Sequence, residues 1–140
     1  MWRIRPADYE ADYAAIRSVR FAVFVDEQHV PQDIEMDDRD PFCIHVLAYE
    51  AEIPIGTGRI DIAASGKVGR LAVLAGMRGR GLGTALMKRL HAIARENALE
   101  SVWCNAQVVA VPFYERLGYR VTSAPFEEAD IEHVRMERTL

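Results

Sequence analysis

Apolar and polar positions follow their clearest pattern between residues 67 and 97. A run of strand length, Val68–Leu74, is mostly apolar, and a glycine-rich turn, Arg78–Gly83, follows it. Beyond the turn, apolar residues recur at three- and four-residue steps in a stripe made of Leu82, Leu86, Leu90, Ile93 and Ala94. This change of period predicts a strand, a tight turn, and an amphipathic helix of about 15 residues that follows from Thr84.

The N-terminal part of the chain predicts a short strand and a helix. Trp2 to Arg5 has strand character, and Pro6 is expected to stop it. Asp8 is a suitable N-cap for the helix that follows, whose apolar stripe is Tyr9, Tyr13, Ile16, Val19 and Val23. The stripe allows one helix, or two that divide near Arg20, and Pro31 marks a loop after it.

The remaining pattern predicts strands with one short helix among them. The expected strands are Phe42–Glu50, Ile53–Ala63, Ser101–Cys104 and Ile131–Arg138, the first two joined by a turn at Ala51–Glu52. A short helix is expected to begin at Pro112 and to have Gly118 at its C′ position. By length, residues 1–140 are expected to form a single domain.

Composition excludes several classes of protein. The chain has 17 basic and 21 acidic residues, and a net charge of −4 argues against a protein that neutralises many nucleic-acid phosphates. No apolar run approaches the roughly 20 residues that a membrane helix requires, and the first residues do not resemble a signal peptide. Cys43 and Cys104 lack metal-ligand spacing. We therefore expect a cytoplasmic protein with reduced thiols and no metal.

The glycine-rich turn has the features of an anion site. Gly79, Gly81 and Gly83 allow tight turning and a close approach of backbone to ligand, and the helix that starts there directs its free N–H groups and positive dipole end into the turn. No Asp or Glu occurs from residue 67 to 95, where the basic residues are Lys67, Arg70, Arg78, Arg80, Lys88, Arg89 and Arg95. This pattern predicts a site for a phosphate group.

Two familiar phosphate motifs fit this turn poorly. A P-loop requires Lys and then Ser or Thr after its last glycine, but Leu82 and Gly83 follow Gly81. A dinucleotide fingerprint requires a third glycine where Thr84 stands, and its acidic residue, here Glu100, should follow a strand that is missing. A nucleotide-binding protein of the NAD type is the weaker alternative.

A third motif fits. Arg78-x-x-Gly81-x-Gly83 resembles the [Q/R]-x-x-G-x-[G/A] signature with which the GNAT acyltransferase superfamily holds the pyrophosphate of acetyl-CoA. Other segments extend the resemblance over nearly the whole chain. These are Arg20–Gln28 (R-x-x-V-F-V-x-E-Q), His45–Ala48 (H-x-x-A), Ala110–Tyr119 (with F-Y and R-x-G-Y) and His133–Met136 (H-x-x-M), typical of small bacterial members.

The resemblance implies a fold, a reaction and a cofactor site. The implied fold is α/β (α+β), with a mixed, mostly antiparallel sheet of six to seven strands, a splayed strand pair and about four helices. The implied reaction is direct acetyl transfer from acetyl-CoA to an amine. The implied CoA-binding residues are Leu71, Ala72, Val73, Arg78, Gly79, Arg80, Gly81, Leu82, Gly83, Thr84 and Asn105.

Catalytic roles also follow from the resemblance. Tyr114 matches the family tyrosine that lies near the sulfur and is the expected general acid for the leaving thiolate. Many family members place a glutamate on the cofactor strand as general base, but this strand has none. Glu27, His45 and His133 are the alternative bases, and their order stays open.

The acidic run from Asp26 to Asp40 concerns the acceptor. It holds seven carboxylates against one base, Arg39, and is interpreted either as a solvated loop or as an electrostatic funnel for a cationic amine. The expected partner is a small-molecule amine or an exposed protein amine, with a homodimer left open. The alternative to an enzyme is a non-catalytic acyl-CoA-binding regulatory module, which the missing strand carboxylate favours.

Overall fold

The computed structural model describes residues 1–140, apart from the side chain of Ile34. Its α-helices are α1 (Tyr13–Arg20), α2 (Gln32–Glu35), α3 (Leu82–Glu96) and α4 (Val111–Arg116), and a π-helical segment, Phe21–Glu27, continues α1. Its strands are β1 (Trp2–Ala7), β2 (Ile44–Glu50), β3 (Ile53–Asp61), β4 (Lys67–Val73), β5 (Ser101–Gln107), β6 (Arg120–Val121), β7 (Phe126–Glu128) and β8 (Ile131–Thr139). Short 3₁₀ turns are Asp40–Phe42, Ile62–Ala64, Ala75–Met77 and Val108–Ala110.

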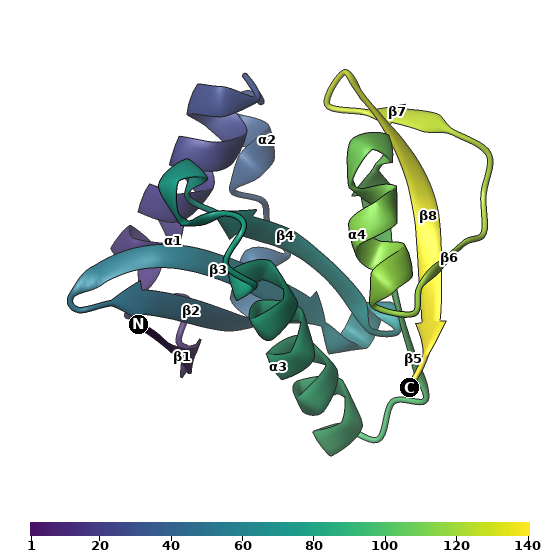
Figure 1. Cartoon of the computed structure of the whole chain (residues 1–140), viewed down its shortest axis with the longest axis horizontal. Coiled ribbons are helices and arrows are strands. Elements are labelled where there is room, and N and C mark those ends of the chain that lie inside the picture. Colours follow the sequence, from purple (N-terminus) through teal and green to yellow (C-terminus); the bar gives the residue numbers. More distant parts are fainter.

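The strands form one sheet in the order β1-β2-β3-β4-β5-β8-β6, with β7 paired to β8 (Figure 1). Every strand pair is antiparallel except β4 and β5, which are parallel. The predicted mixed, mostly antiparallel sheet is therefore confirmed. The structure has eight strands because β6 and β7, of two and three residues, are too short to leave an alternating pattern in the sequence.

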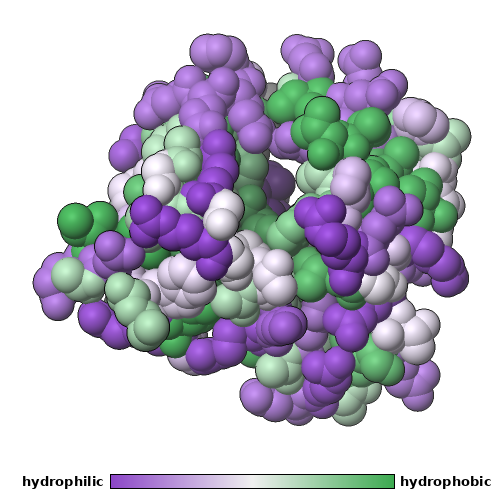
Figure 2. All heavy atoms as spheres, in the orientation of Figure 1, coloured by the Kyte–Doolittle hydropathy of each residue, from purple (hydrophilic) through white to green (hydrophobic). Residues whose placement is uncertain are grey.

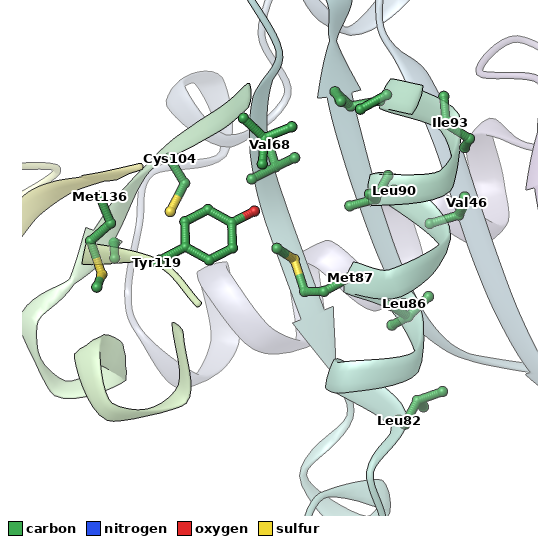
Figure 3. Packing of buried hydrophobic residues seen from close by; sticks show 14 of the residues in the cluster. Val46, Val68, Leu82, Leu86, Met87, Leu90, Ile93, Cys104, Tyr119 and Met136 are labelled. Carbon is green, nitrogen blue, oxygen red and sulfur yellow. The ribbon is translucent and has the colours of Figure 1, made fainter. Parts of the chain in front are cut away.

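Helix α3 covers one face of the sheet through its leucine stripe. Leu82, Leu86 and Leu90 are at most 1% exposed, and burying each contributes about 1.5–3 kcal/mol. Gly56 and Gly58 of β3 permit the close approach, since a Cβ atom at Gly56 would lie 2.9 Å from Leu86 Cδ1. Figure 3 shows Met87, also on α3, pointing toward Tyr119 and Cys104, and these residues belong to the same hydrophobic cluster as the leucines, so one core joins both halves of the sheet. No described helix is long and apolar enough to cross a membrane.

Helix α1 covers the opposite face, and its ends differ from the prediction. The chain does not divide into two helices at Arg20: Arg20 and Phe21 both have helical dihedral angles, and only the hydrogen-bond pattern changes there, from α to π. The predicted N-cap, Asp8, is wrong: its backbone N–H donates to Asp12 Oδ2 at 2.9 Å, which closes a turn and delays the helix to Tyr13. Strand β1 also continues through Pro6, because it is an edge strand in which a missing N–H is tolerated.

A bulge in β4 lies where this strand diverges from β5. Thr57 of β3 pairs with Ala72, but Arg59 pairs with Gly69, so β4 contains one residue more than β3 between these pairs. Arg70 lies in this interval with φ of 51°, in the left-handed region. The register between β4 and β5 consists of the single pair Lys67 and Trp103. From Gly69 to Val73, β4 therefore has no described strand partner on its β5 side.

A cluster of ion pairs lies beneath α1 and beside the bulge. Arg20 is fully buried and donates to Glu35 Oε1 and Asp40 Oδ1, each at 2.8 Å. Arg59 donates to Asp37 at 2.8 Å and to Asp40 at 2.6 Å. Arg70 donates to Asp37 at 3.1 Å, so three arginines from α1, β3 and β4 meet three carboxylates. This arrangement joins the loop after α1 to two neighbouring strands.

Substitution of Arg20 by Met should lower the free energy of unfolding by about 3–5 kcal/mol, because Glu35 and Asp40 would keep buried charges without their partner. Arg39→Met is the matched control. In the wild-type protein Arg39 pairs with Asp61, and the Arg39 side chain is 46% exposed. Ion pairs near the surface contribute about 0–1 kcal/mol to stability. Urea unfolding monitored by circular dichroism measures both values. Equal losses in the two variants would contradict the importance of the buried cluster.

Candidate active site

A cleft of about 730 Å³ lies where β4 and β5 diverge. Figure 2 shows the corresponding hollow between the two halves of the molecule. One wall comes from β4, the π-helical segment and the ion cluster, and the other comes from β5, α4 and the turn between β7 and β8. Its lining includes Phe24, Gln28, Asp37, Arg70, Leu71, Val73, Arg78, Trp103, Cys104, Asn105, Gln107, Tyr114, Glu128 and His133.

The glycine-rich turn has the backbone geometry that an anion site requires. Gly79 and Gly81 have φ values of 79° and 82°, and Gly81 is the N-cap of α3. The first helical hydrogen bond across this cap runs from Ala85 N to Gly81 O at 3.0 Å, so the preceding N–H groups of the helix have no acceptor within it. A Cβ atom built on Gly79 or Gly81 meets no atom within 4 Å. The space above the turn is therefore open to a ligand.

Arg78 connects this turn to both β4 and the π-helical segment. Its Nε donates to the carbonyl of Val73 at 2.9 Å, and its two Nη atoms donate to the carboxylate of Glu27 at 2.8 and 3.0 Å. Glu27, a predicted base, thus lies at the glycine-rich turn and is held by an ion pair. The Arg78 side chain remains 45% exposed, so it can still contact a ligand at the mouth of the cleft.

The predicted cofactor strand borders the cleft with an unpaired edge. Leu71 and Val73 line it, whereas the side chain of Ala72 is buried against Val19 and Val23. Asn105 lies on the opposite wall, on β5. The backbone of β4 on one side and an amide side chain on the other can pair with the amide groups of an extended ligand.

Tyr114 lies on α4 and lines the same cleft. The helix begins as predicted, with Pro112 in its first turn, and Gly118 has φ of 88° just after its end. The Tyr114 ring packs edge to face on Phe113 and Tyr119, with centroid distances of 5.1 and 5.5 Å. Burial raises the pKa of Tyr114, so its hydroxyl is protonated at neutral pH.

The histidines proposed as bases have different positions. His45 is 1% exposed and is not part of the cleft lining; its Nε2 lies 2.9 Å from the carbonyl oxygen of Asp40, and its ring stacks on Tyr9 at 5.0 Å. Burial lowers the pKa of His45, consistent with a neutral ring that joins β2 to the loop. His133, by contrast, lines the cleft from β8.

Only part of the acidic run is solvated, and in that part Asp26, Asp33 and Asp38 are exposed. Three other carboxylates, Glu35, Asp37 and Asp40, form ion pairs with the arginines of the buried cluster. Residues Gln32–Glu35 form a helical turn. Burial alone would raise the pKa of Asp37, but hydrogen bonds and charge from Arg59 lower it to about 2. The signal in the sequence was Arg20, a charged residue four positions after Ile16 in an apolar stripe.

Both cysteines are thiols rather than thiolates. Burial raises the pKa of Cys104, which lines the cleft, to about 12, and that of Cys43 to about 11. A thiolate is the nucleophilic form of cysteine, so neither side chain is suited to carry an acyl group during a reaction.

Sequence reasoning did not find a bridge across the cleft. Gln107 Nε2, at the end of β5, donates to Gln28 Oε1, at the end of the π-helical segment, at 2.7 Å. These residues are 79 positions apart, and each looks like an ordinary polar residue at the end of an element. Trp103 and Glu128 also line the cleft, and no motif in the sequence marks either of them as part of a site.

Comparison with known proteins gives consistent matches. A sequence model described as Acetyltransferase (GNAT) domain matches residues 8–140. The Bacillus subtilis (strain 168) protein named Uncharacterized N-acetyltransferase YjcF is 40% identical over 120 residues, which cover 84% of this chain and 86% of that protein. The crystal structure of an acyl-CoA N-acyltransferase from Pseudomonas aeruginosa has a TM-score of 0.89 at 25% identity, covering 99% and 100% of the two chains. Escherichia coli ElaA has a TM-score of 0.86 at 27% identity, covering 97% and 99%.

Alkylation by iodoacetamide at pH 8 should be slow in the folded protein. A thiol whose pKa is about 11, such as Cys43, is ionised in roughly one molecule in a thousand, whereas an unperturbed thiol is ionised in about a quarter. The rate should therefore rise at least about 100-fold when the chain is unfolded in urea, with free glutathione in the same urea as control. Labelling of Cys104 in the folded state at the rate of the control would contradict its assignment as an inert thiol.

Proposed function

This chain belongs to the GNAT acetyltransferase family, and from that premise we propose that it transfers an acetyl group directly from acetyl-CoA to a primary amine. Members of this family use acyl-CoA donors and acetylate amine acceptors. The donor, the direct route and the roles of individual residues are the parts of the proposal that depend on the cleft.

One observation supports the donor assignment most strongly. The unpaired edge of β4 leads directly, through four residues after Val73, to Arg78 and the open glycine turn at the start of α3. A helix N-terminus binds a diphosphate, and an open strand edge binds a chain of amides. Coenzyme A has both groups joined in that order, followed by its thiol. The thioester would then lie in the cleft that Tyr114 lines.

The cleft residues have separate tasks in this proposal. Backbone N–H groups from Gly79 to Thr84 bind the diphosphate, and the edge at Leu71–Val73 aligns the pantetheine arm. A backbone N–H near Val73 polarises the carbonyl oxygen of the thioester, a role of the oxyanion-hole type. Holding the two reactants in contact supplies much of the acceleration, because the attack becomes effectively unimolecular.

Tyr114 is best suited to stabilise the leaving sulfur through a hydrogen bond. Complete proton transfer from an ordinary phenol, with a pKa near 10, to a thiolate whose thiol has a pKa near 8.5 costs about 2 kcal/mol. Burial raises the pKa of Tyr114 and so increases this cost. A donated hydrogen bond needs no complete transfer, and it strengthens as negative charge develops on sulfur.

The direct route rests on the state of the thiols. An acyl-enzyme route requires a nucleophile in the cleft, and Cys104 is the thiol there. Because burial raises the pKa of Cys104 to about 12, the amine itself is the better nucleophile.

Release of CoA thiol from acetyl-CoA, measured over a panel of primary amines, tests the proposal. We expect acceptor-dependent release above the rate of hydrolysis for at least one amine class. Saturable CoA binding without acceptor-dependent release across the panel would instead support a non-catalytic acyl-CoA-binding module. Thermal stabilisation by NAD but not by CoA would refute both.

Gly81→Asp should weaken CoA binding at least about 100-fold, because a carboxylate would face the diphosphate at the helix N-terminus. Gly81→Asn is the matched control, since Asn has the same shape and tolerates the same positive φ without the charge. Isothermal titration calorimetry compares the two variants. Similar affinities for CoA in both would refute the phosphate assignment of the turn.

Tyr114→Phe should lower kcat about 10- to 100-fold, the loss expected when a hydrogen bond to a charged group is removed. Its affinity for CoA should remain near that of the wild-type protein, because the ring keeps its packing on Phe113 and Tyr119. Steady-state kinetics with a saturating amine measure kcat. An unchanged kcat would remove Tyr114 from the reaction.

A further inference from the structure

We propose that His133 is the general base of this site, and that Glu128 and the carbonyl of Ile131 position it to take the proton from the acceptor amine. This inference rests on the proposed acetyl transfer. It assigns the group that the β4 strand, without a carboxylate from Gly69 to Val73, does not supply.

His133 lines the cleft on the wall opposite β4, and its ring is buried. In the sheet register it pairs with Gln107 of β5 and with Phe126 of β7, and its ring stacks on Phe126 at 6.0 Å. Strand alternation places Gln107 and His133 on one face of the sheet, whereas Cys104 points to the other face, into the core that Tyr114 borders. A base and an acid on opposite faces can serve an amine that enters from one side and a thiolate that leaves on the other.

The tautomer of His133 is set by its backbone contact. Nδ1 lies 2.6 Å from the carbonyl oxygen of Ile131. A carbonyl oxygen only accepts hydrogen bonds, so Nδ1 must carry the ring proton. In the neutral ring Nε2 then has a free lone pair, which is the form that a base requires.

Glu128 lies where it can stabilise the charged ring. Its Oε2 is 3.7 Å from His133 Nε2, within ion-pair distance of a ring that has accepted a proton. The turn that joins β7 to β8 consists of Ala129 and Asp130, with φ values of 53° and 60°. Two successive residues with positive φ form the tight hairpin turn that matches strand twist, and for Ala129 this conformation is strained. The turn fixes Glu128 opposite Ile131, on the same face as His133.

Of the polar and charged groups on the elements packed against His133, Glu128 is the carboxylate that lies beside its ring. Its β5 partner, Gln107, is uncharged and is bonded to the uncharged Gln28 across the cleft. On its own strand, Arg135 points to the same face, but its guanidinium lies over Trp103 at 3.9 Å and near Glu137 at 3.4 Å. On β7, Glu127 pairs with Glu132, and both alternate to the opposite face.

The remaining candidate bases are occupied elsewhere. Glu27 forms a bidentate ion pair with Arg78 at the phosphate turn, and His45 lies under Tyr9, outside the cleft lining. Asp37 lines the cleft, but Arg59 and Arg70 bind its oxygens, and its pKa of about 2 makes it a very weak base.

The proton balance closes with these groups. The amine nitrogen attacks the acetyl carbon, and its lone pair forms the new C–N bond. A proton on that nitrogen passes to Nε2 of His133 as the C–S bond breaks and its electron pair stays on sulfur. The thiolate, which accepts a hydrogen bond from Tyr114, gains a proton from water, and the imidazolium of His133 returns one to water. The products are the amide and CoA thiol.

The tautomer can be tested in the wild-type protein by ¹⁵N nuclear magnetic resonance of the histidine rings. We expect His133 to show a protonated Nδ1 and a lone-pair Nε2 at a pH where the ring is neutral. A protonated Nε2 in the neutral ring would overturn the proposal, whatever the activity of any variant.

Kinetics of His133→Asn test the role itself. Asn keeps an N–H donor near the position of Nδ1 but has no atom at Nε2. With an amine that the wild-type protein acetylates, kcat/KM should fall at least about 100-fold, and the fall in rate toward acid pH should disappear. Affinity for CoA should be unchanged. A variant that binds CoA and keeps the wild-type pH–rate profile would overturn the role of His133. A wild-type protein without turnover would refute the proposed acetyl transfer itself, and the role of His133 with it.

Glu128→Gln separates positioning from chemistry. Loss of the carboxylate should move the acid limb of the pH–rate profile to lower pH and reduce kcat/KM less than His133→Asn does. Glu132→Gln is the matched control, because it removes a nearby carboxylate from the opposite face. An acid limb that moves equally in both variants would show a general effect of charge and would overturn the role of Glu128.

Discussion

The structure depends on a single constraint: β4 pairs fully with β3 but with β5 only at its beginning. Past Lys67 and Trp103 the two strands diverge, and the sheet continues as two halves that share one hydrophobic core. The exposed edge, the cleft and the access of Tyr114 and His133 to one space all follow from this divergence. A sheet paired along its full length would have neither a cleft nor a free edge.

The buried ion cluster binds the bulge of β4 that lies where β4 and β5 diverge. Arg70 has a positive φ, a conformation that costs a non-glycine residue of order 1–3 kcal/mol. Its guanidinium binds Asp37, which also binds Arg59 on the next strand, and Arg20 connects the same loop to α1. Buried ion pairs are weak sources of net stability, but each has one geometry. The main contribution of the cluster is therefore geometric: it fixes the position of the cleft wall that β4 forms.

Much of the fold was predictable, because the signals that specify helices and strands are local. The stripe of α3, the glycine turn before it and the Pro112 to Gly118 helix all appear at their expected places. The predictions fail where contacts between residues far apart in the sequence determine the structure. Carboxylates of the acidic run look like a solvated loop until Arg20, Arg59 and Arg70 reach them, and Gln28 and Gln107 have no local reason to meet. The position of His133 beside Glu128 likewise depends on a tight turn, and the residues in that turn, Ala129 and Asp130, are not ones that predict it.

The open edge of β4 also bears on how this chain behaves at high concentration. Unpaired strand edges are the templates through which proteins join one another into extended sheets, and natural proteins usually shield them. Here the edge is recessed in a cleft of about 730 Å³, between an arginine-rich wall and the β5 half, where a strand from a second molecule has little room. The recess therefore shields this edge from pairing with a strand of a second molecule.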